Sequence, residues 1–118
     1  VASAMAAGAL AQMLGGNVNE IINASALALK NILGLTCDPV CGLVEVPCIK
    51  RNAFLAVHAV TGAELALCGV ESKIPMDEIV DTLKITGQLM SPVLKETSQG
   101  GLAKTPTALE LENVLFKN

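Results

Sequence analysis

Three of the four cysteines in this chain fall within one short segment, GLTCDPVCGLVEVPC, at residues 34–48. Three residues separate Cys37 from Cys41, and six separate Cys41 from Cys48. Thiols in such a segment can coordinate a metal, form disulfides, act as nucleophiles or fill space as small apolar side chains. The function of the chain therefore depends on which of these roles the segment has.

Spacing alone leaves several of these roles open. Disulfides are disfavoured, because nothing in the sequence indicates secretion and a cytoplasmic setting, which we expect here, keeps thiols reduced. Structural zinc usually uses paired C-x2-C knuckles, whereas the spacings here are C-x3-C and C-x6-C. An iron–sulfur cluster accepts more varied spacings and needs three or four thiolates. Zinc, a cluster and plain loop cysteines all remain possible at this point.

The elements that must position these thiols are predicted to be helices. The chain is 52% hydrophobic but has only two aromatic residues, Phe54 and Phe116, so its core must be filled by aliphatic side chains suited to closely packed helices. Its 118 residues suffice for one domain. We predict an all-α, compact helical domain of about four main helices with two functional loops.

The spacing of apolar residues, together with glycine, proline and capping residues, predicts where these helices begin and end. Asn17 with Glu20 resembles a capping box, Gly15-Gly16 ends the preceding helix, and Ser91-Pro92 breaks the pattern after the fourth. The predicted helices cover residues 1–14, 17–34, about 47–68, from Pro75 to before Ser91, and a short terminal stretch at 108–116. The prolines at 39 and 47 indicate that the cysteine segment is a loop.

Charge and hydropathy exclude two classes of partner. The net charge is -3, and the eight Lys and Arg residues are dispersed, so we expect no nucleic acid partner and no anionic membrane surface. Residues 1–19 carry no charge, but polar residues dilute this run and no Trp, Tyr or basic flank marks a membrane interface. A buried core helix is the better interpretation.

Two motifs resemble one known family. The runs GLTCDPVCGLVEVPCIKRNA, residues 34–53, and KETSQGGLA, residues 95–103, are similar to the catalytic alpha chain or domain of iron–sulfur-dependent L-serine dehydratases, also called L-serine ammonia-lyases. The similarity extends over essentially the whole chain. It implies that residues 1–118 are a helical catalytic domain fragment of an enzyme that holds a [4Fe–4S] cluster.

The resemblance also implies cluster ligands. Cys37 and Cys48 match family ligands, whereas Cys41 stands where the family has glycine, as in DPVGGLV, and would be at most a substitute ligand. A further family ligand lies in a GC motif upstream of the stretch that VASAMAAGAL resembles, and some members end in a cysteine where this chain ends in LFKN. We expect an N-terminally truncated fragment that assembles no normal cluster by itself.

The implied reaction is dehydration and deamination of L-serine to pyruvate and ammonia, with a cluster iron acting as Lewis acid on the hydroxyl. The implied substrate-binding residues are Lys95, Thr97, Ser98, Gln99, Gly100 and Gly101. Without the resemblance, an ordinary solvated loop is the better interpretation of these residues. The implied partners are L-serine and a second serine dehydratase subunit or domain, in a homo-oligomeric enzyme. No general base is assigned.

Four other residues have less specific interpretations. Arg51 and Asn52 can hydrogen-bond a cluster sulfide or the substrate, or serve as surface or capping residues. His58 is interpreted as a structural histidine of the third helix, and Cys68 as a core residue. Two other classes of function stay open: a non-catalytic cysteine-based metal-binding module, and a helical interaction domain that docks on a partner.

Overall fold

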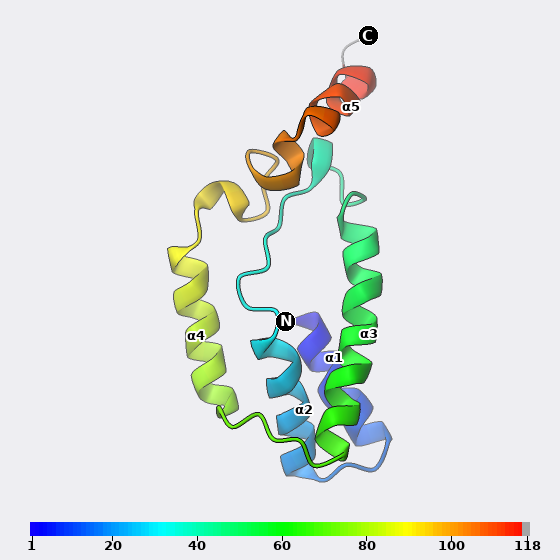
Figure 1. Ribbon diagram of the computed structural model, residues 1–118, viewed down its shortest axis with the longest axis vertical. Helices are drawn as coiled ribbons and strands as arrows, with labels where there is room; N and C mark the ends of the chain where they lie inside the picture. The colour runs from blue at the N-terminus through cyan, green and yellow to red at the C-terminus, as the bar shows by residue number, and fades with distance from the viewer. Residues whose placement is uncertain (117–118) are drawn as a thin grey trace. The chain divides into compact units, whose positions relative to one another are not determined.

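The computed structural model describes residues 1–116, and these residues are all-α (Figure 1). The helices are α1 (Ala2–Met13), α2 (Val18–Lys30), η1 (Val40–Gly42), α3 (Cys48–Leu67), α4 (Met76–Leu89), η2 (Pro92–Leu94), η3 (Gly101–Lys104) and α5 (Pro106–Phe116), where η marks a short 3-10 helix. The all-α prediction is confirmed, with four main helices and a shorter terminal one. Residues 117 and 118 of the LFKN end lie outside the described residues.

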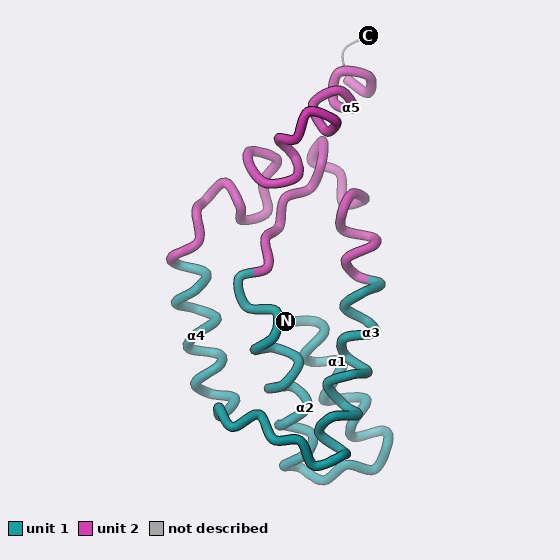
Figure 2. Tube along the Cα trace, in the orientation of Figure 1, with its two compact units in different colours: residues 1–34, 53–88 teal, residues 35–52, 89–118 magenta. Residues whose placement is uncertain are grey.

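The chain divides into two compact units (Figure 2). Unit 1 comprises residues 1–34 and 53–88, and unit 2 comprises residues 35–52 and the chain from residue 89 onward. Helix α3 begins in unit 2 and continues in unit 1. Cys37, Cys48 and the KETSQGG loop all belong to unit 2, so the candidate site is described within that unit. The assignment of residues 1–118 to one catalytic domain stays a prediction.

The core of unit 1 is made mainly of alanine. Its buried alanines are Ala4, Ala7, Ala11, Ala24, Ala26, Ala28, Ala59, Ala63 and Ala66. A Cβ at Gly8 of α1 would stand 2.5 Å from Ser25 Oγ on α2, and one at Gly62 of α3 would stand 3.2 Å from Ala28 Cβ. Small side chains therefore set how closely these helices approach. The uncharged run at residues 1–19 comprises α1, the turn after it and the start of α2, and one face of α1 is buried in the core.

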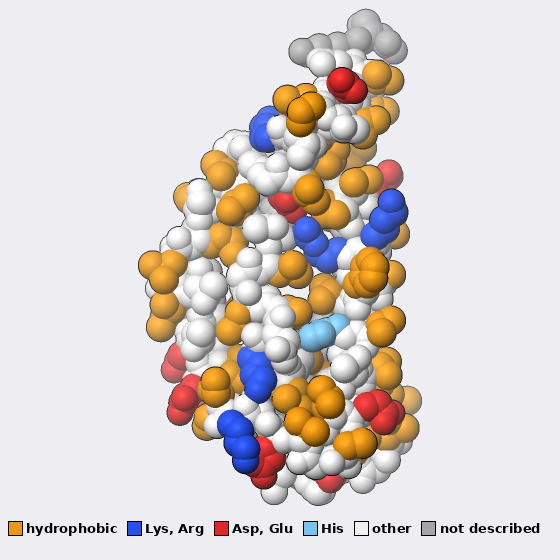
Figure 3. Space-filling view, viewed as in Figure 1, with side chains coloured by type: hydrophobic (Ala, Val, Ile, Leu, Met, Phe, Trp, Pro, Cys, Tyr) orange, Lys and Arg blue, Asp and Glu red, His pale blue; other side chains and the backbone are white. Residues whose placement is uncertain are grey.

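Many larger hydrophobic side chains lie on the surface instead. Met13, Phe54 and Leu89 are 83%, 78% and 82% exposed. Figure 3 shows hydrophobic side chains over much of the visible face.

Among residues 1–116, no helix combines the length and the apolar character that a membrane span requires.

Helix α2 begins as predicted and ends earlier than predicted. Asn17 Oδ1 accepts hydrogen bonds from the N–H groups of Asn19 at 2.9 Å and Glu20 at 3.2 Å, and Glu20 Oε2 accepts from the Asn17 N–H at 2.7 Å. This capping box stabilises the helix start by about 1 kcal/mol. The helix ends at Lys30 rather than near Gly34. Asn31 is its C-cap, with φ −83° and ψ −1°, and the chain then turns through residues 31–34 to Gly34, whose φ is +78°.

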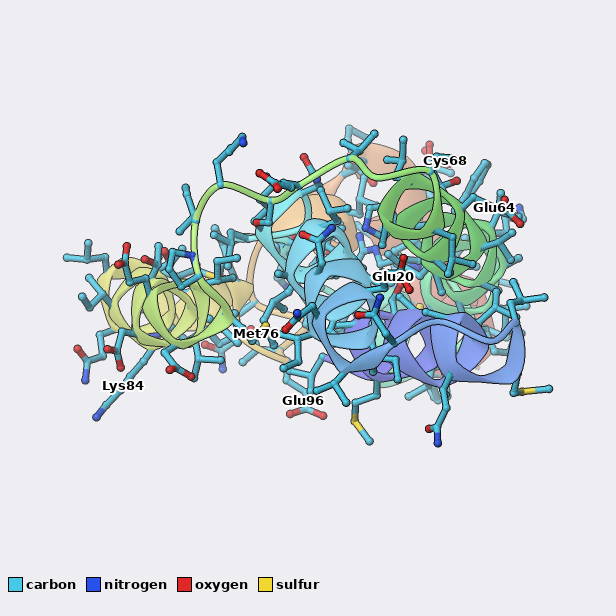
Figure 4. The ribbon with its side chains drawn as sticks, turned by 90° about the horizontal axis from the view of Figure 1, so that it is seen from below. Glu20, Glu64, Cys68, Met76, Lys84 and Glu96 are labelled. Atoms are coloured by element: carbon cyan, nitrogen blue, oxygen red, sulfur yellow. The ribbon has the colours of Figure 1, made fainter. Side chains whose placement is uncertain are left out.

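The structure agrees with the interpretation of His58 and contradicts that of Cys68. Nε2 of His58 lies 2.8 Å from the Ala28 carbonyl oxygen, so this side chain links α3 to α2 within unit 1. The interpretation of Cys68 as a core residue is wrong: its side chain is exposed at the end of α3 (Figure 4). Cys68 follows Leu67, the last helical residue, where the chain already turns toward Gly69.

An open groove of about 290 Å³ in unit 1 is lined by α2 and by residues 71–76. Within the groove the Ser72 N–H donates to Asn23 Oδ1 at 2.7 Å, and Lys30 Nζ, from the last residue of α2, donates to the Ser72 carbonyl at 2.6 Å. Beside it, the hydrogen bond from Lys73 lowers the pKa of the exposed Glu71 carboxyl. None of the predicted site residues lines this groove.

Candidate functional site

The cysteine segment is a loop, as predicted, and the structure adds one 3-10 turn within it. The turn is η1, the Val46–Pro47 peptide bond is cis, and Cys48 is the first residue of α3. All four cysteines carry free thiols; Cys37 is exposed, and Cys41 and Cys48 are partly buried. The segment is therefore not organised by disulfides, and its geometry must come from hydrogen bonds and burial.

The two motifs meet along the backbone of Cys37. Its N–H donates to the Leu94 carbonyl at 3.0 Å, and its carbonyl accepts from the N–H groups of Glu96 at 2.8 Å and Thr97 at 3.3 Å. This pairing is an isolated parallel β-bridge between Cys37 and Lys95. The predicted ligand Cys37 and the predicted substrate loop therefore lie next to each other.

The polar side chains of the loop have two kinds of environment. Ser98 Oγ donates to the Pro39 carbonyl at 2.8 Å, and Thr97 Oγ1 donates to the Val93 carbonyl at 2.7 Å. The exposed polar side chains of the loop are Lys95, Glu96 and Gln99, of which Lys95 and Gln99 are among the predicted substrate-binding residues. Ser98 and Thr97 thus stabilise the loop itself, whereas Lys95 and Gln99 extend toward solvent.

Asp38, which the sequence analysis did not single out, is the most buried polar residue of the site. It is 2% exposed. Its Oδ1 lies 3.2 Å from Arg51 Nη2, its Oδ2 accepts from the Leu102 N–H at 2.7 Å, and Arg51 Nη1 donates to the Thr36 carbonyl at 2.5 Å. A buried carboxylate requires such paired donors. In the sequence, the one indication of this pair is that Asp38 and Arg51 occur within the same motif, residues 34–53.

The two glycines of the loop are required by its packing. Gly101 has a φ of +59°, and a Cβ there would lie 2.9 Å from Cβ and Cγ of Asp38 and closer still to Oδ2. A Cβ at Gly100 would lie 2.9 Å from the Val93 carbonyl oxygen and from Val93 Cγ2. Close backbone approach and a positive φ therefore explain the GG pair, and in the structure the close neighbours are protein atoms.

Cys41 occupies a backbone conformation that suits glycine. It lies in η1 with φ 56° and ψ 16°, which is the left-handed region. This explains why glycine is suitable at the position where the resemblance expects it. The Cys41 thiol lies 4.0 Å from the Ala108 carbonyl oxygen of α5.

Arg51 and Asn52, considered together from the sequence, have different environments. The guanidinium of Arg51 is held by Thr36 and Asp38 and its side chain is 22% exposed, so Arg51 organises the loop rather than extending into solvent. Asn52 is exposed on α3. Only Arg51 is therefore part of the hydrogen-bonded site.

The residues present fit part of an iron–sulfur ligand set. Cys37 and Cys48 are reduced, at least partly accessible thiols in the same unit, and thiolates are the donors that such clusters prefer. Cys48 opens a helix, where the backbone N–H groups favour a negatively charged ligand. Within residues 1–116, however, no three His, Cys, Asp or Glu side chains converge to hold a metal. The described residues alone therefore supply an incomplete set.

Comparison with known proteins settles the family. The serine dehydratase alpha chain family matches residues 1–103 of this sequence. The chain belongs to this family. Both the cysteine segment and the loop that pairs with Cys37 lie within the matched range.

Individual serine dehydratases show how much of such proteins this chain covers. It is 54% identical to the probable L-serine dehydratase alpha chain of Bacillus subtilis, 49% identical to that of Latilactobacillus sakei and 46% identical to the L-serine dehydratase alpha chain of Peptoniphilus asaccharolyticus. Each match covers 98% of this chain but only 38%, 55% and 40% of the respective relative. The chain therefore spans about half the length of these relatives or less.

Proposed function

We propose that this chain contributes the cysteine and substrate segments of an iron–sulfur-dependent L-serine dehydratase, which converts L-serine to pyruvate and ammonia. The observation that carries the proposal is the backbone pairing of Cys37 with residues 94–97, because it brings a thiol ligand beside a loop of polar groups. The relatives named L-serine dehydratase support the same substrate.

In this proposal Cys37 and Cys48 are two of the thiolate ligands of a [4Fe–4S] cluster, whose remaining ligands come from outside the described set. When bound, such a cluster supplies a Lewis-acidic iron that stabilises hydroxide as it leaves the substrate. Cys41 is not included, because its thiol faces the α5 carbonyl of Ala108 and its backbone conformation suits glycine.

The chain's own loop residues hold the substrate. Lys95 is exposed beside Cys37, where its ammonium group can pair with the carboxylate of serine. Ser98 donates to Pro39, and its oxygen keeps lone pairs that can accept from the substrate ammonium group. Thr97 shapes the loop, and Gln99 offers an exposed amide. Gly100 and Gly101 let the loop backbone pack closely against Val93 and Asp38.

The proposal extends to partners and setting. L-serine is the small-molecule substrate, and a second serine dehydratase subunit or domain completes the enzyme, which acts as a homo-oligomer in the cytoplasm.

Substitution of single cysteines in the full-length enzyme tests the proposal. After anaerobic reconstitution, Cys37→Ser and Cys48→Ser are expected to lose visible cluster absorbance and pyruvate formation, since oxygen ligands hold such clusters poorly. Cys68→Ser is the matched control, because Cys68 is an exposed thiol in the other unit and should change neither.

Two results would contradict the proposal. Retention of the cluster and of turnover by Cys37→Ser would remove the cluster-ligand assignment. Stoichiometric zinc loading, with no visible absorbance and no pyruvate from serine in the unsubstituted enzyme, would favour a non-catalytic metal-binding module instead.

A further inference from the structure

Two adjacent residues, Cys37 and Asp38, hold both ends of the KETSQGG loop. The backbone of Cys37 binds Leu94 and Glu96 at the start of the loop. The side chain of Asp38 binds the Leu102 N–H just after its end. One dipeptide of the cysteine segment therefore anchors both ends of the loop.

The Asp38 carboxylate divides its two oxygens between different segments. Oδ2 accepts from the Leu102 N–H at 2.7 Å, whereas Oδ1 faces the Arg51 guanidinium at 3.2 Å. Arg51 in turn donates to the Thr36 carbonyl, on the other side of Cys37 in the chain. The two neighbours of Cys37 in the chain, Thr36 and Asp38, are thus both bound to Arg51. The Cys37 thiol between them is exposed.

We propose that Asp38 and Arg51 are positioning residues that keep the substrate loop in register with the cluster ligand Cys37. The inference rests on the proposed function, and it assigns a role to a pair whose observed contacts are all with protein groups. Because the loop and the ligand share these contacts, ordering one favours ordering the other, and this coupling must be reciprocal.

The chemistry of the pair requires these residue types. Asparagine at position 38 would place an amide NH2 group opposite either the Leu102 N–H or the Arg51 guanidinium, so a donor would face a donor. Lysine at position 51 would keep the charge but lose the planar group that reaches Thr36 and Asp38 together. Asp38→Asn and Arg51→Lys therefore each remove the positioning while changing the side chain little.

The test uses the reconstituted full-length enzyme with Asp38→Asn, Arg51→Lys and Glu45→Gln. Glu45 is an exposed carboxylate of the same segment, so its amide variant removes the same charge without touching the loop. We expect both positioning variants to raise the KM for serine about tenfold, the size of losing one hydrogen bond to a charged group, while Glu45→Gln does not. Iron content and visible absorbance should stay near those of the wild type.

A second measurement does not depend on turnover. Hydrogen exchange of residues 93–104 and 35–42, read by mass spectrometry, should quicken in both positioning variants. The acceptors of the Leu102 and Glu96 N–H groups, which are the Asp38 carboxylate and the Cys37 carbonyl, are no longer held in place by the Asp38–Arg51 pair. If Asp38→Asn does not fold, Arg51→Lys carries the test alone, since that side chain is 22% exposed and the substitution keeps its charge.

The outcomes separate this inference from the proposed function. If the apparent kcat falls only in proportion to the amount of folded enzyme and the KM for serine is unchanged, the pair serves stability alone. That result would overturn the positioning role. Unchanged hydrogen exchange in both variants would overturn it as well. If the wild-type enzyme, fully loaded with iron, makes no pyruvate from serine, the proposed function fails, and the exchange result alone then decides whether Asp38 orders the loop.

Discussion

Gly101 lies so close to Asp38 that a Cβ added to it would stand 2.9 Å from both Cβ and Cγ of the aspartate. The glycine also has a φ of +59°, which side chains disfavour. The end of the KETSQGG loop thus packs directly against the cysteine segment at Asp38, and this contact leaves no room for a side chain at position 101.

Gly101→Ala should lower the free energy of unfolding by about 2–5 kcal/mol, combining a left-handed backbone cost of roughly 1–2 kcal/mol with about 1–3 kcal/mol of overpacking. Gly69→Ala is the matched control, because Gly69 has a φ of +82° but no heavy atom within 4 Å of an added Cβ. Denaturant unfolding of the full-length protein, followed by circular dichroism, compares the two. Equal losses would show that the contact with Asp38 is not restrictive.

Cys41→Gly should raise the free energy of unfolding by about 1 kcal/mol, because glycine adopts the φ of 56° without steric cost. The thiol lies 4.0 Å from its neighbouring carbonyl oxygen, so little is lost with it. Cys41→Ala removes the thiol but keeps the Cβ, and should leave stability near that of the wild type. Iron content and serine turnover should be unchanged in both; a loss comparable to that of Cys37→Ser would make Cys41 a ligand.

Lys95→Ala should impair serine turnover while leaving stability within about 0.5 kcal/mol, because an exposed side chain contributes little to folding. Ser98→Ala should impair turnover and also cost about 1 kcal/mol of stability, since it removes the hydrogen bond to Pro39. Lys104→Ala removes an equivalent exposed charge from η3 and serves as the control. Steady-state constants and thermal midpoints are measured on the same preparations, with cluster absorbance expected to be normal. Unaltered kinetics in Lys95→Ala and Ser98→Ala would remove the substrate-loop assignment.

The sequence alone was enough for features that depend on neighbouring residues. The Asn17–Glu20 capping box and the start of α4 after Pro75 depend on groups within one helical turn, so residue type and spacing predict them directly. The all-α class followed in the same way from aliphatic composition and helical periodicity. The loop around Cys37 was also predictable, because proline restricts the residue that precedes it.

Tertiary structure alone decided which of these loops adjoin and which polar groups are buried. Cys37 pairs with the loop around Lys95 through backbone N–H and carbonyl groups, which every residue carries and which leave no mark in the sequence. Asp38 was overlooked for a related reason: a carboxylate is ordinarily exposed, and its 2% exposure depends on Arg51 and Leu102 reaching it from distant positions in the chain. Cys68 was misassigned to the core because burial depends on which elements cover a helix end, and the order of residues along the chain does not specify that covering.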